Sequence, residues 1–105
     1  MKLFVPGNFR GDARFIMRRS GYGENPSVKN GRLEMSYVRR LSPNQYPRFH
    51  VYIEKQPDGL QINLHLDQKK ASYEGFTAHN GEYDGELVEG EMARLKSSVL
   101  IMKIA

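Results

Sequence analysis

The 105-residue sequence contains no cysteine and no tryptophan. Without cysteine, the chain can form neither disulfide bonds nor the thiolate sites that hold structural zinc and iron–sulfur clusters. It also lacks any apolar run near the ~18 residues that a membrane-spanning helix requires, and residues 1–6 are too few for the hydrophobic region of a secretory signal. We therefore expect a soluble, cytoplasmic protein with no membrane partner.

Repeats, low-complexity tracts and long linkers are also missing. Hydrophobic residues make up 39% of the chain and charged residues 27%, which is typical of a folded protein rather than a disordered one. The length suits one folding unit. We predict a single domain covering residues 1–105.

The chain carries an excess of positive charge, and this charge is unevenly distributed along the sequence. Residues 1–55 contain eleven Lys and Arg against four Asp and Glu, a net charge of +7, whereas residues 56–105 have a net charge of −3. Eight of the eleven aromatic residues also lie in the basic part. Basic and aromatic side chains in one segment favour an anionic partner, because guanidinium groups bind phosphate and stack on rings.

The first predicted element is a short helix at residues 11–21, which Asp12 caps, Ile16 and Met17 anchor to the core and Gly21 ends. Residues 22–31 are predicted as a loop, because they contain glycines, Pro26 and Asn-Gly without hydrophobic periodicity.

Three strands are predicted next, at about residues 33–41, 48–55 and 61–68, because apolar residues alternate with polar ones in each segment. Apolar residues must face apolar ones across a hairpin, which places His50 opposite Asp67 and Tyr52 opposite His65. The same argument places Arg40 near His50. Arg39 falls on the apolar face, and an edge position or a bulge would relieve it.

The last part of the chain is predicted as a loop at residues 69–81, a helix from about Gly85 to Ser97 capped by Asp84, and a tail from Val99 to Ile104. The tail could extend the helix, but its β-branched residues favour a short strand. Such a strand could pair with a second copy of the chain by edge addition, which gives a possible homodimer through Val99 to Ile104.

These elements predict an α+β fold with the order α-β-β-β-α-β. A small antiparallel sheet of three to four strands would carry two helices on one face and leave its other face open.

The open face carries the residues that indicate function. Aromatic and imidazole rings can stack on bases while guanidinium groups neutralise phosphate, so we expect a non-enzymatic module that binds RNA or another polyanion without a cofactor. The predicted nucleic-acid-binding residues are Arg18, Arg19, Tyr22, Arg40, Arg48, His50, Tyr52 and His65. Tyr22 is included because it lies between two glycines, where its ring would be free to move.

A second interpretation is a small metal-dependent hydrolase that acts on phosphodiesters. Imidazole and carboxylate groups bind zinc or manganese, and the bound ion would generate a hydroxide nucleophile. The predicted metal ligands are His50, His65, Asp67, His79 and Glu82.

Two further interpretations remain open. The two histidines of the open face could perform metal-free acid–base chemistry on a phosphodiester, with His50 holding its proton beside Asp67 and His65 acting as the base. Alternatively, the face is an ordinary solvated surface, and the protein is an adaptor for other proteins.

Overall fold

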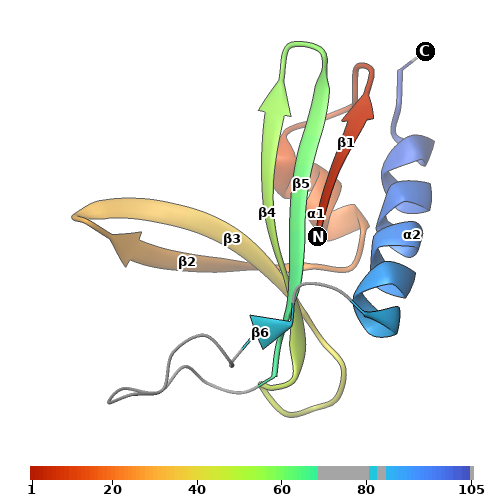
Figure 1. The fold of residues 1–105 in the computed structure, drawn as a ribbon. Coiled ribbons are helices and arrows are strands. Elements are labelled where there is room, and N and C mark those ends of the chain that lie inside the picture. The colour runs from red at the N-terminus through yellow and green to blue at the C-terminus, as the bar shows by residue number, and fades with distance from the viewer. Residues whose placement is uncertain (69–80, 83–84, 105) are drawn as a thin grey trace.

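The computed structural model describes residues 1–68 and 85–104 in full and the backbone of residues 81–82. Figure 1 shows a twisted sheet with one helix behind its strands and the other to their right. The elements are, in chain order, β1 (Lys2–Pro6), α1 (Ala13–Arg19), β2 (Gly23–Lys29), β3 (Arg32–Arg40), β4 (Arg48–Gln56), β5 (Gly59–Asp67), β6 (Gly81–Glu82) and α2 (Glu86–Ile101).

The sheet is antiparallel, with the strand order β1-β5-β4-β3-β2 and with the two-residue β6 paired to the end of β5. The predicted α+β class is confirmed, but the predicted number of strands is too low. The sequence argument missed the two outer strands, β1 and β2.

The segment predicted as a loop, residues 22–31, contains strand β2. This strand lies at the edge of the sheet, where residues typical of loops are tolerated. Pro26 pairs with Met35, and an edge strand tolerates proline since one side of its backbone needs no hydrogen-bond partner. Asn30 and Gly31, with φ of 52° and 74°, form the tight turn to β3. Positive φ at both central residues is what a two-residue hairpin requires, and Asn-Gly is a preferred pair for it.

Strand β1 was missed because it is short. Leu3 and Val5 point toward the core, opposite Ile62 and Leu60, so the strand does alternate. The preceding ammonium group of Met1 donates to the carbonyl of Leu64 at 2.8 Å, which extends the pairing beyond the strand.

The predicted faces of the central strands are correct, but the predicted registers are off by two residues. His50 pairs with His65 rather than with Asp67, and Tyr52 pairs with Asn63. The β4–β5 connection is a two-residue turn, because Gln56 already pairs with Gly59. A shift of two residues preserves the side-chain alternation, so the polar residues stay together on one face.

Both helices cover the same face of the sheet (Figure 1). The shared core includes Ile16 and Met17 from α1, Val88, Leu95 and Val99 from α2, and alternate residues of β4 and β5. The predicted cap of α1 is confirmed, because the backbone N–H of Phe15 donates to Oδ1 of Asp12 at 2.9 Å. The predicted cap of α2, Asp84, lies outside the described residues.

The prediction of a C-terminal strand is wrong. Helix α2 continues to Ile101, because Val99 extends the buried face of the helix and is fully buried. What remains of strand pairing is one bridge between Phe9 and Lys103. The homodimer expected through Val99 to Ile104 stays a prediction, and Leu100, Ile101 and Ile104 of this segment are exposed.

A buried carboxylate joins the helices to β3. Glu91 of α2 is 5% exposed and accepts hydrogen bonds from the hydroxyl of Tyr22 at 2.6 Å and from the guanidinium of Arg94 at 2.8 Å. Nη1 of Arg39 lies 3.4 Å from the same carboxylate. This contact explains how Arg39 fits on the apolar face, without the expected bulge or edge position.

Strands β2 and β3 form a hairpin that projects from the body of the molecule (Figure 1). Strand β3 pairs with β4 only from Tyr37 to Arg40, so its earlier part leaves the sheet together with β2. Within the described part of the chain, no helix combines the length and hydrophobicity needed to cross a bilayer.

Candidate nucleic-acid interface

The side chains of the helix-free face come from the even positions of β3 and β4 and the odd positions of β5. Cross-strand pairing sets His50 beside His65, Tyr52 beside Asn63, and Arg48 beside Asp67. Strand β1 adds Lys2, which pairs with Asn63. The alternation of these strands sends their apolar residues to the helices and these polar residues to the opposite face.

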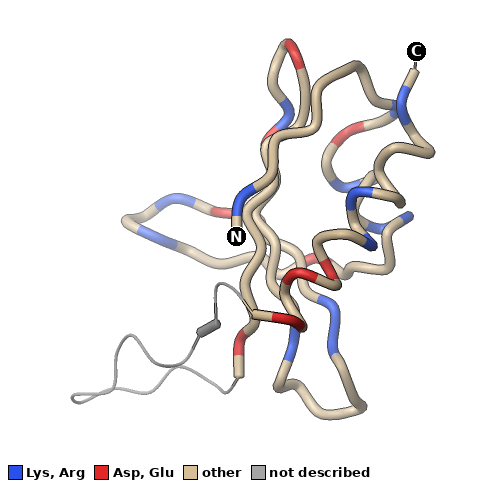
Figure 2. Tube along the Cα trace, turned by 45° about the vertical axis from the view of Figure 1, so that its right-hand side comes forward, with Lys and Arg blue, Asp and Glu red and all other residues tan. Residues whose placement is uncertain are grey.

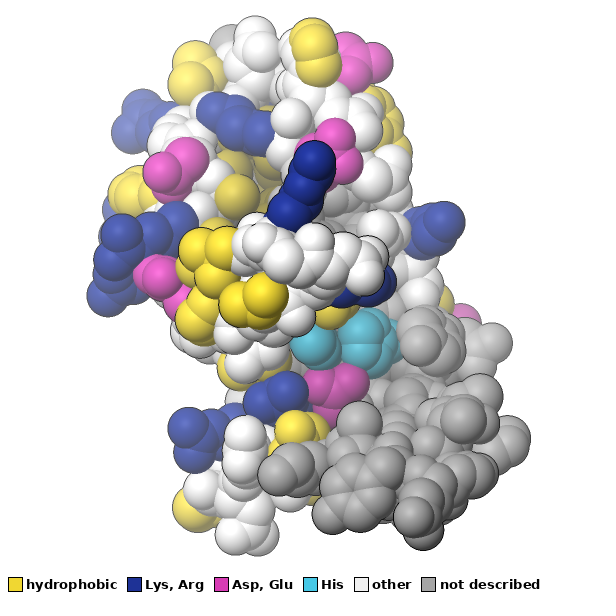
Figure 3. All heavy atoms as spheres, turned by 90° about the vertical axis from the view of Figure 1, so that its left-hand side faces the viewer, with side chains coloured by type: hydrophobic (Ala, Val, Ile, Leu, Met, Phe, Trp, Pro, Cys, Tyr) yellow, Lys and Arg dark blue, Asp and Glu magenta, His cyan; other side chains and the backbone are white. Residues whose placement is uncertain are grey.

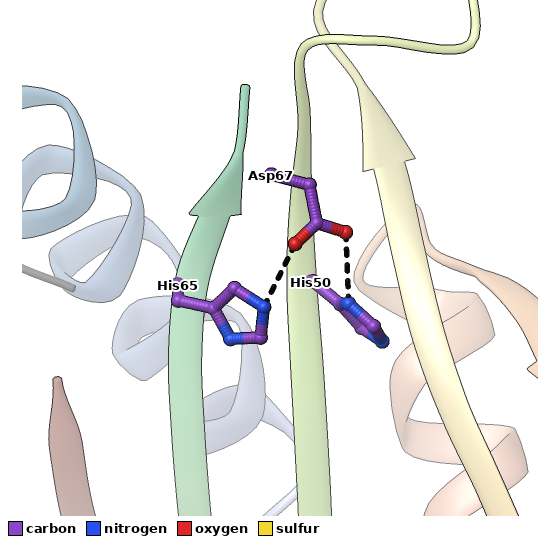
Figure 4. A group of neighbouring side chains, drawn as sticks. All are labelled: His50, His65 and Asp67. Atoms are coloured by element: carbon purple, nitrogen blue, oxygen red, sulfur yellow. Dashed lines mark hydrogen bonds and ion pairs between the residues drawn. The ribbon is translucent and has the colours of Figure 1, made fainter. Parts of the chain in front are cut away.

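Asp67 lies at the centre of a polar cluster on this face. Its Oδ2 is 2.9 Å from Nδ1 of His50 and 3.0 Å from Nε of Arg48, and its Oδ1 is 2.8 Å from Nε2 of His65. Figure 4 shows the carboxylate between the two imidazole rings. The second nitrogen of His50, Nε2, is 2.7 Å from Oγ of Ser36.

These contacts determine where the protons lie. Burial would raise the pKa of the Asp67 carboxyl, but hydrogen bonds from His50, His65 and Arg48 outweigh burial and hold the pKa well below its usual range. The ionised carboxylate can only accept, so His50 carries a proton on Nδ1 and His65 carries one on Nε2. His50 is 8% exposed and uses both ring nitrogens within the protein. Asp67 and Ser36 therefore hold the His50 ring in position from both sides.

Three rings lie together on this surface. The centroids of His50 and Tyr52 are 4.9 Å apart, those of His50 and His65 are 4.8 Å apart, and those of Tyr52 and His65 are 6.3 Å apart with 21° between their planes. Tyr52 and His65 are half-buried, so parts of both rings face solvent. The predicted group of His50, Tyr52 and His65 is thus brought together.

A groove of about 540 Å³ runs over the rings of Tyr52 and His65, between the sheet and the projecting hairpin. Its lining residues are Met1, Lys2, Lys29, Glu34, Tyr52, Asn63, Leu64 and His65. A smaller hollow of about 230 Å³ shares Tyr52 and Asn63 with it. Figure 3, which looks toward the hairpin, shows the histidine side chains in the hollow below it.

The floor of the groove contains an unpaired acceptor. Oδ1 of Asn63 is buried and has no hydrogen-bond partner among the described residues. Buried polar atoms nearly always have a partner, and an exception requires an explanation.

The structure places three of the predicted binding residues elsewhere. Tyr22 was predicted to move freely between its glycines, but it is 3% exposed and its hydroxyl is bound to Glu91, so its ring cannot stack on a ligand. Burial and the hydrogen bond to Glu91 raise the pKa of this hydroxyl far above its usual range. Arg18 and Arg19 lie on α1, on the helical side, where the guanidinium of Arg19 lies 5.3 Å from the ring of Phe15.

Two predicted arginines lie at the end of the open face. Arg48 pairs with Arg40 across β3 and β4, but its guanidinium is held by Asp67 and lies 4.5 Å from the ring of Tyr46. Arg40 is exposed. The early cations therefore do not converge on one surface: Figure 2 shows Lys and Arg both along the hairpin and on the helical side.

Lys2, Lys29 and Glu34 were not predicted as site residues. Each lies on a strand that the sequence argument missed or on the hairpin that it read in part as a loop. The Asn-Gly pair after Lys29 was the signal that could have revealed the hairpin.

Three of the predicted metal ligands lie together. One ligand atom each from His50, His65 and Asp67 lie within 4.8 Å of one another. His79 lies outside the described residues, and Glu82 is described only by its backbone pairing with Leu66. The Arg48 guanidinium beside Asp67 opposes a dication there, because it already neutralises the carboxylate.

Comparisons with protein-family models, curated proteins and solved structures found no match to the chain.

Proposed function

We propose that this protein is a cytoplasmic, non-enzymatic module that binds single-stranded RNA in the groove of its helix-free face. The observation that carries the proposal is the combination of Tyr52 and His65 on the floor of this groove with Lys2 and Lys29 in its lining. Rings that stack on bases beside cations that contact phosphate are the two components of single-strand binding.

The size of the groove supports a nucleotide-sized ligand. Its volume of about 540 Å³ lies within the range of roughly 300–1,000 Å³ that is common for small-ligand sites. Unstacked bases can enter such a space, whereas bases within a duplex cannot turn toward the rings. Single strands are therefore favoured over duplexes.

The test is a titration of a labelled single-stranded RNA of about ten nucleotides, and of its duplex, followed by fluorescence anisotropy. The single strand should bind more tightly, and its affinity should fall as salt rises from about 50 to about 200 mM because counterions are released. Tyr52→Ala should weaken binding about 5-fold to 100-fold through lost stacking.

A matched pair of variants separates the groove from general charge. Lys29→Ala should lower the salt slope by about 0.7, the contribution of one phosphate contact in a single strand. Arg18→Ala removes the same charge from the helical side and should leave affinity and slope nearly unchanged. Equal effects of the two variants, or no salt-dependent binding at all, would refute the proposal.

A second candidate function, metal-dependent hydrolysis of phosphodiesters, rests on the proximity of His50, His65 and Asp67. Its test is elemental analysis of protein purified without chelating resin, followed by hydrolysis assays with added Zn²⁺ or Mn²⁺. If the site binds metal, His65→Ala should abolish both metal retention and turnover, since imidazole supplies a ligand. Because Arg48 occupies the carboxylate, we expect metal-free protein without hydrolytic activity.

A further inference from the structure

We infer that the helical side of the molecule carries a docking surface for an acidic segment of a partner protein. This surface, which we call the α1 surface, is made by the exposed residues of α1 and by the C-terminal end of α2. Both helices pack on the face of the sheet opposite the RNA groove. The inference therefore does not depend on the proposed binding of RNA.

Two hollows adjoin each other on the α1 surface, because Phe15 and Arg19 line both of them. The first hollow has a volume of about 420 Å³, and its other lining residues are Arg10, Ser98, Ile101 and Met102. The second has a volume of about 380 Å³, and its other lining residues are Asp12, Arg14 and Arg18. Hollows of this size accept side chains of a bound peptide.

Hydrogen bonds between distant parts of the chain hold the walls of the first hollow together. The backbone N–H of Arg10 donates to the carbonyl of Met102 at 2.9 Å, and the hydroxyl of Ser98 lies 2.8 Å from that of Ser20. The segment before α1, the end of α1 and the end of α2 are thus fixed relative to one another. A site that is already formed binds a ligand without a cost for its own ordering.

Exposed apolar side chains line the first hollow. Ile101 is 85% exposed and Phe15 is 39% exposed, whereas Met102 is buried. A single exposed apolar residue needs no explanation, but adjoining ones surrounded by charged residues are typical of interaction sites. An apolar side chain placed between Phe15 and Ile101 would remove both from water.

The α1 surface is positively charged, since four arginines and one aspartate line the two hollows. Arg14 is paired with Glu24, but Arg10, Arg18 and Arg19 form no ion pair with any residue that the structure describes. Their guanidinium groups are therefore available to carboxylates, which they bind through two parallel hydrogen bonds. Charge complementarity thus favours an acidic partner.

Two other polyanions fit the α1 surface less well. A nucleic acid would use the arginines but not Ile101, and the guanidinium of Arg19 lies over the Phe15 ring, 5.3 Å from its centroid, where a base would stack. An anionic bilayer presents a broad interface that covers convex apolar faces, and it cannot fill a hollow as a single side chain can.

A second copy of the chain is also a poor occupant. In a two-fold dimer each patch meets the same patch, so the free arginines of one copy would approach those of the other. Like charges brought together across an interface oppose binding. The occupant that remains is a protein segment with one apolar side chain for the first hollow and Asp or Glu residues beside it for the arginines.

The experiment is an NMR titration of the isotope-labelled protein with a synthetic peptide of about ten residues, in which one leucine is flanked by aspartates and glutamates. Backbone signals of α1 and of residues 98–102 should shift, and those of the groove residues in β4 and β5 should stay in place. Two control peptides, with the leucine replaced by serine or with the carboxylates replaced by amides, should each bind about tenfold more weakly.

Matched variants separate the α1 surface from general charge and hydrophobicity. Arg19→Glu should weaken peptide binding about tenfold, whereas Arg32→Glu makes the same change at an exposed position of the hairpin and should have little effect. Ile101→Ser should also weaken binding, whereas Leu87→Ser, at a 54% exposed position near the other end of α2, should not. If Arg19→Glu disturbs folding by circular dichroism, the Ile101 and Leu87 pair decides the question.

Three outcomes would overturn the inference. The first is no binding of the acidic peptide, or equal effects of the matched variants. The second is cosedimentation with phosphatidylserine vesicles that Ile101→Ser abolishes, which would assign the surface to a membrane. The third is a dimer of the protein alone that Ile101→Ser converts to a monomer, which would assign the surface to a second copy of the chain.

Discussion

At the scale of single residues, Asp67 determines how the open face is built. One carboxylate accepts hydrogen bonds from two imidazole rings and a guanidinium, and Ser36 holds the far side of one of these rings. The cluster fixes the positions of His50 and His65 beside Tyr52. The polar face is therefore an ordered surface that can present its rings without reorganisation.

The lowered pKa of Asp67 predicts a loss of stability in acid. Because the native pKa lies below the value of about 4 for an unfolded Asp, the stabilisation is complete above that value and is lost as the pH falls through it toward the native pKa. Asp67→Asn should lower the free energy of unfolding by about 2–3 kcal/mol at neutral pH, since Arg48 and the imidazoles lose their charged partner.

Urea unfolding at neutral pH and at about pH 3 measures this effect. The difference between the two pH values should be smaller for Asp67→Asn than for the unaltered protein. Asp58→Asn, in the exposed β4–β5 turn, is the control, and it should leave the difference unchanged because Asn suits turn positions. An identical acid response of Asp67→Asn and the unaltered protein would contradict this account.

At the scale of elements, Glu91 joins α2 to β3 and to the segment that follows α1. Its contacts with Tyr22 and Arg39 cross element boundaries. Arg94 of the same helix donates to Glu91 and also to the carbonyl of Ser20 at 2.8 Å. Burial would raise the pKa of the Glu91 carboxyl, but hydrogen bonds from Arg94 and Tyr22 lower it overall. The carboxylate therefore orients the helical layer against the sheet.

Glu91→Gln should destabilise the protein by about 1–3 kcal/mol, because two guanidinium groups lose their buried counter-charge. This cost is smaller than for a fully buried pair, since the side chains of Arg39 and Arg94 are 38% and 39% exposed. The expected result in urea is a lower midpoint with an unchanged slope. Glu89→Gln on the exposed side of the same helix should have almost no effect, and a similar loss from both variants would exclude the assigned role.

At the scale of the whole molecule, the sequence predicted local features better than it predicted the long-range arrangement of the strands. The cap and buried face of α1, and the two faces of β4 and β5, follow from spacing that a few residues determine. The strand registers do not follow from local spacing, because a two-residue shift preserves the side-chain alternation. Only the turn geometry distinguishes the alternative registers.

The missed outer strands have a different cause. Pro26 and the glycines near β2 are unfavourable signals for a central strand and acceptable ones at an edge, and position in the sheet is a property of the assembled fold. For the same reason, the charge asymmetry of the sequence did not map onto one surface. Arg19 lies ten positions before the groove residue Lys29 in the sequence, yet it belongs to α1, which packs on the face of the sheet opposite the groove.

The projecting hairpin separates ligand recognition from the stability of the core. Its tip residues, Val28 and Leu33, are 74% and 71% exposed, and the hairpin leaves the body where β3 stops pairing with β4. One wall of the groove therefore belongs to a hairpin whose outer part packs little against the core, whereas the floor belongs to the sheet that carries the core. The length and sequence of such a hairpin can change with little loss of fold stability. The ligand preference of the groove could therefore change during evolution while the fold is retained.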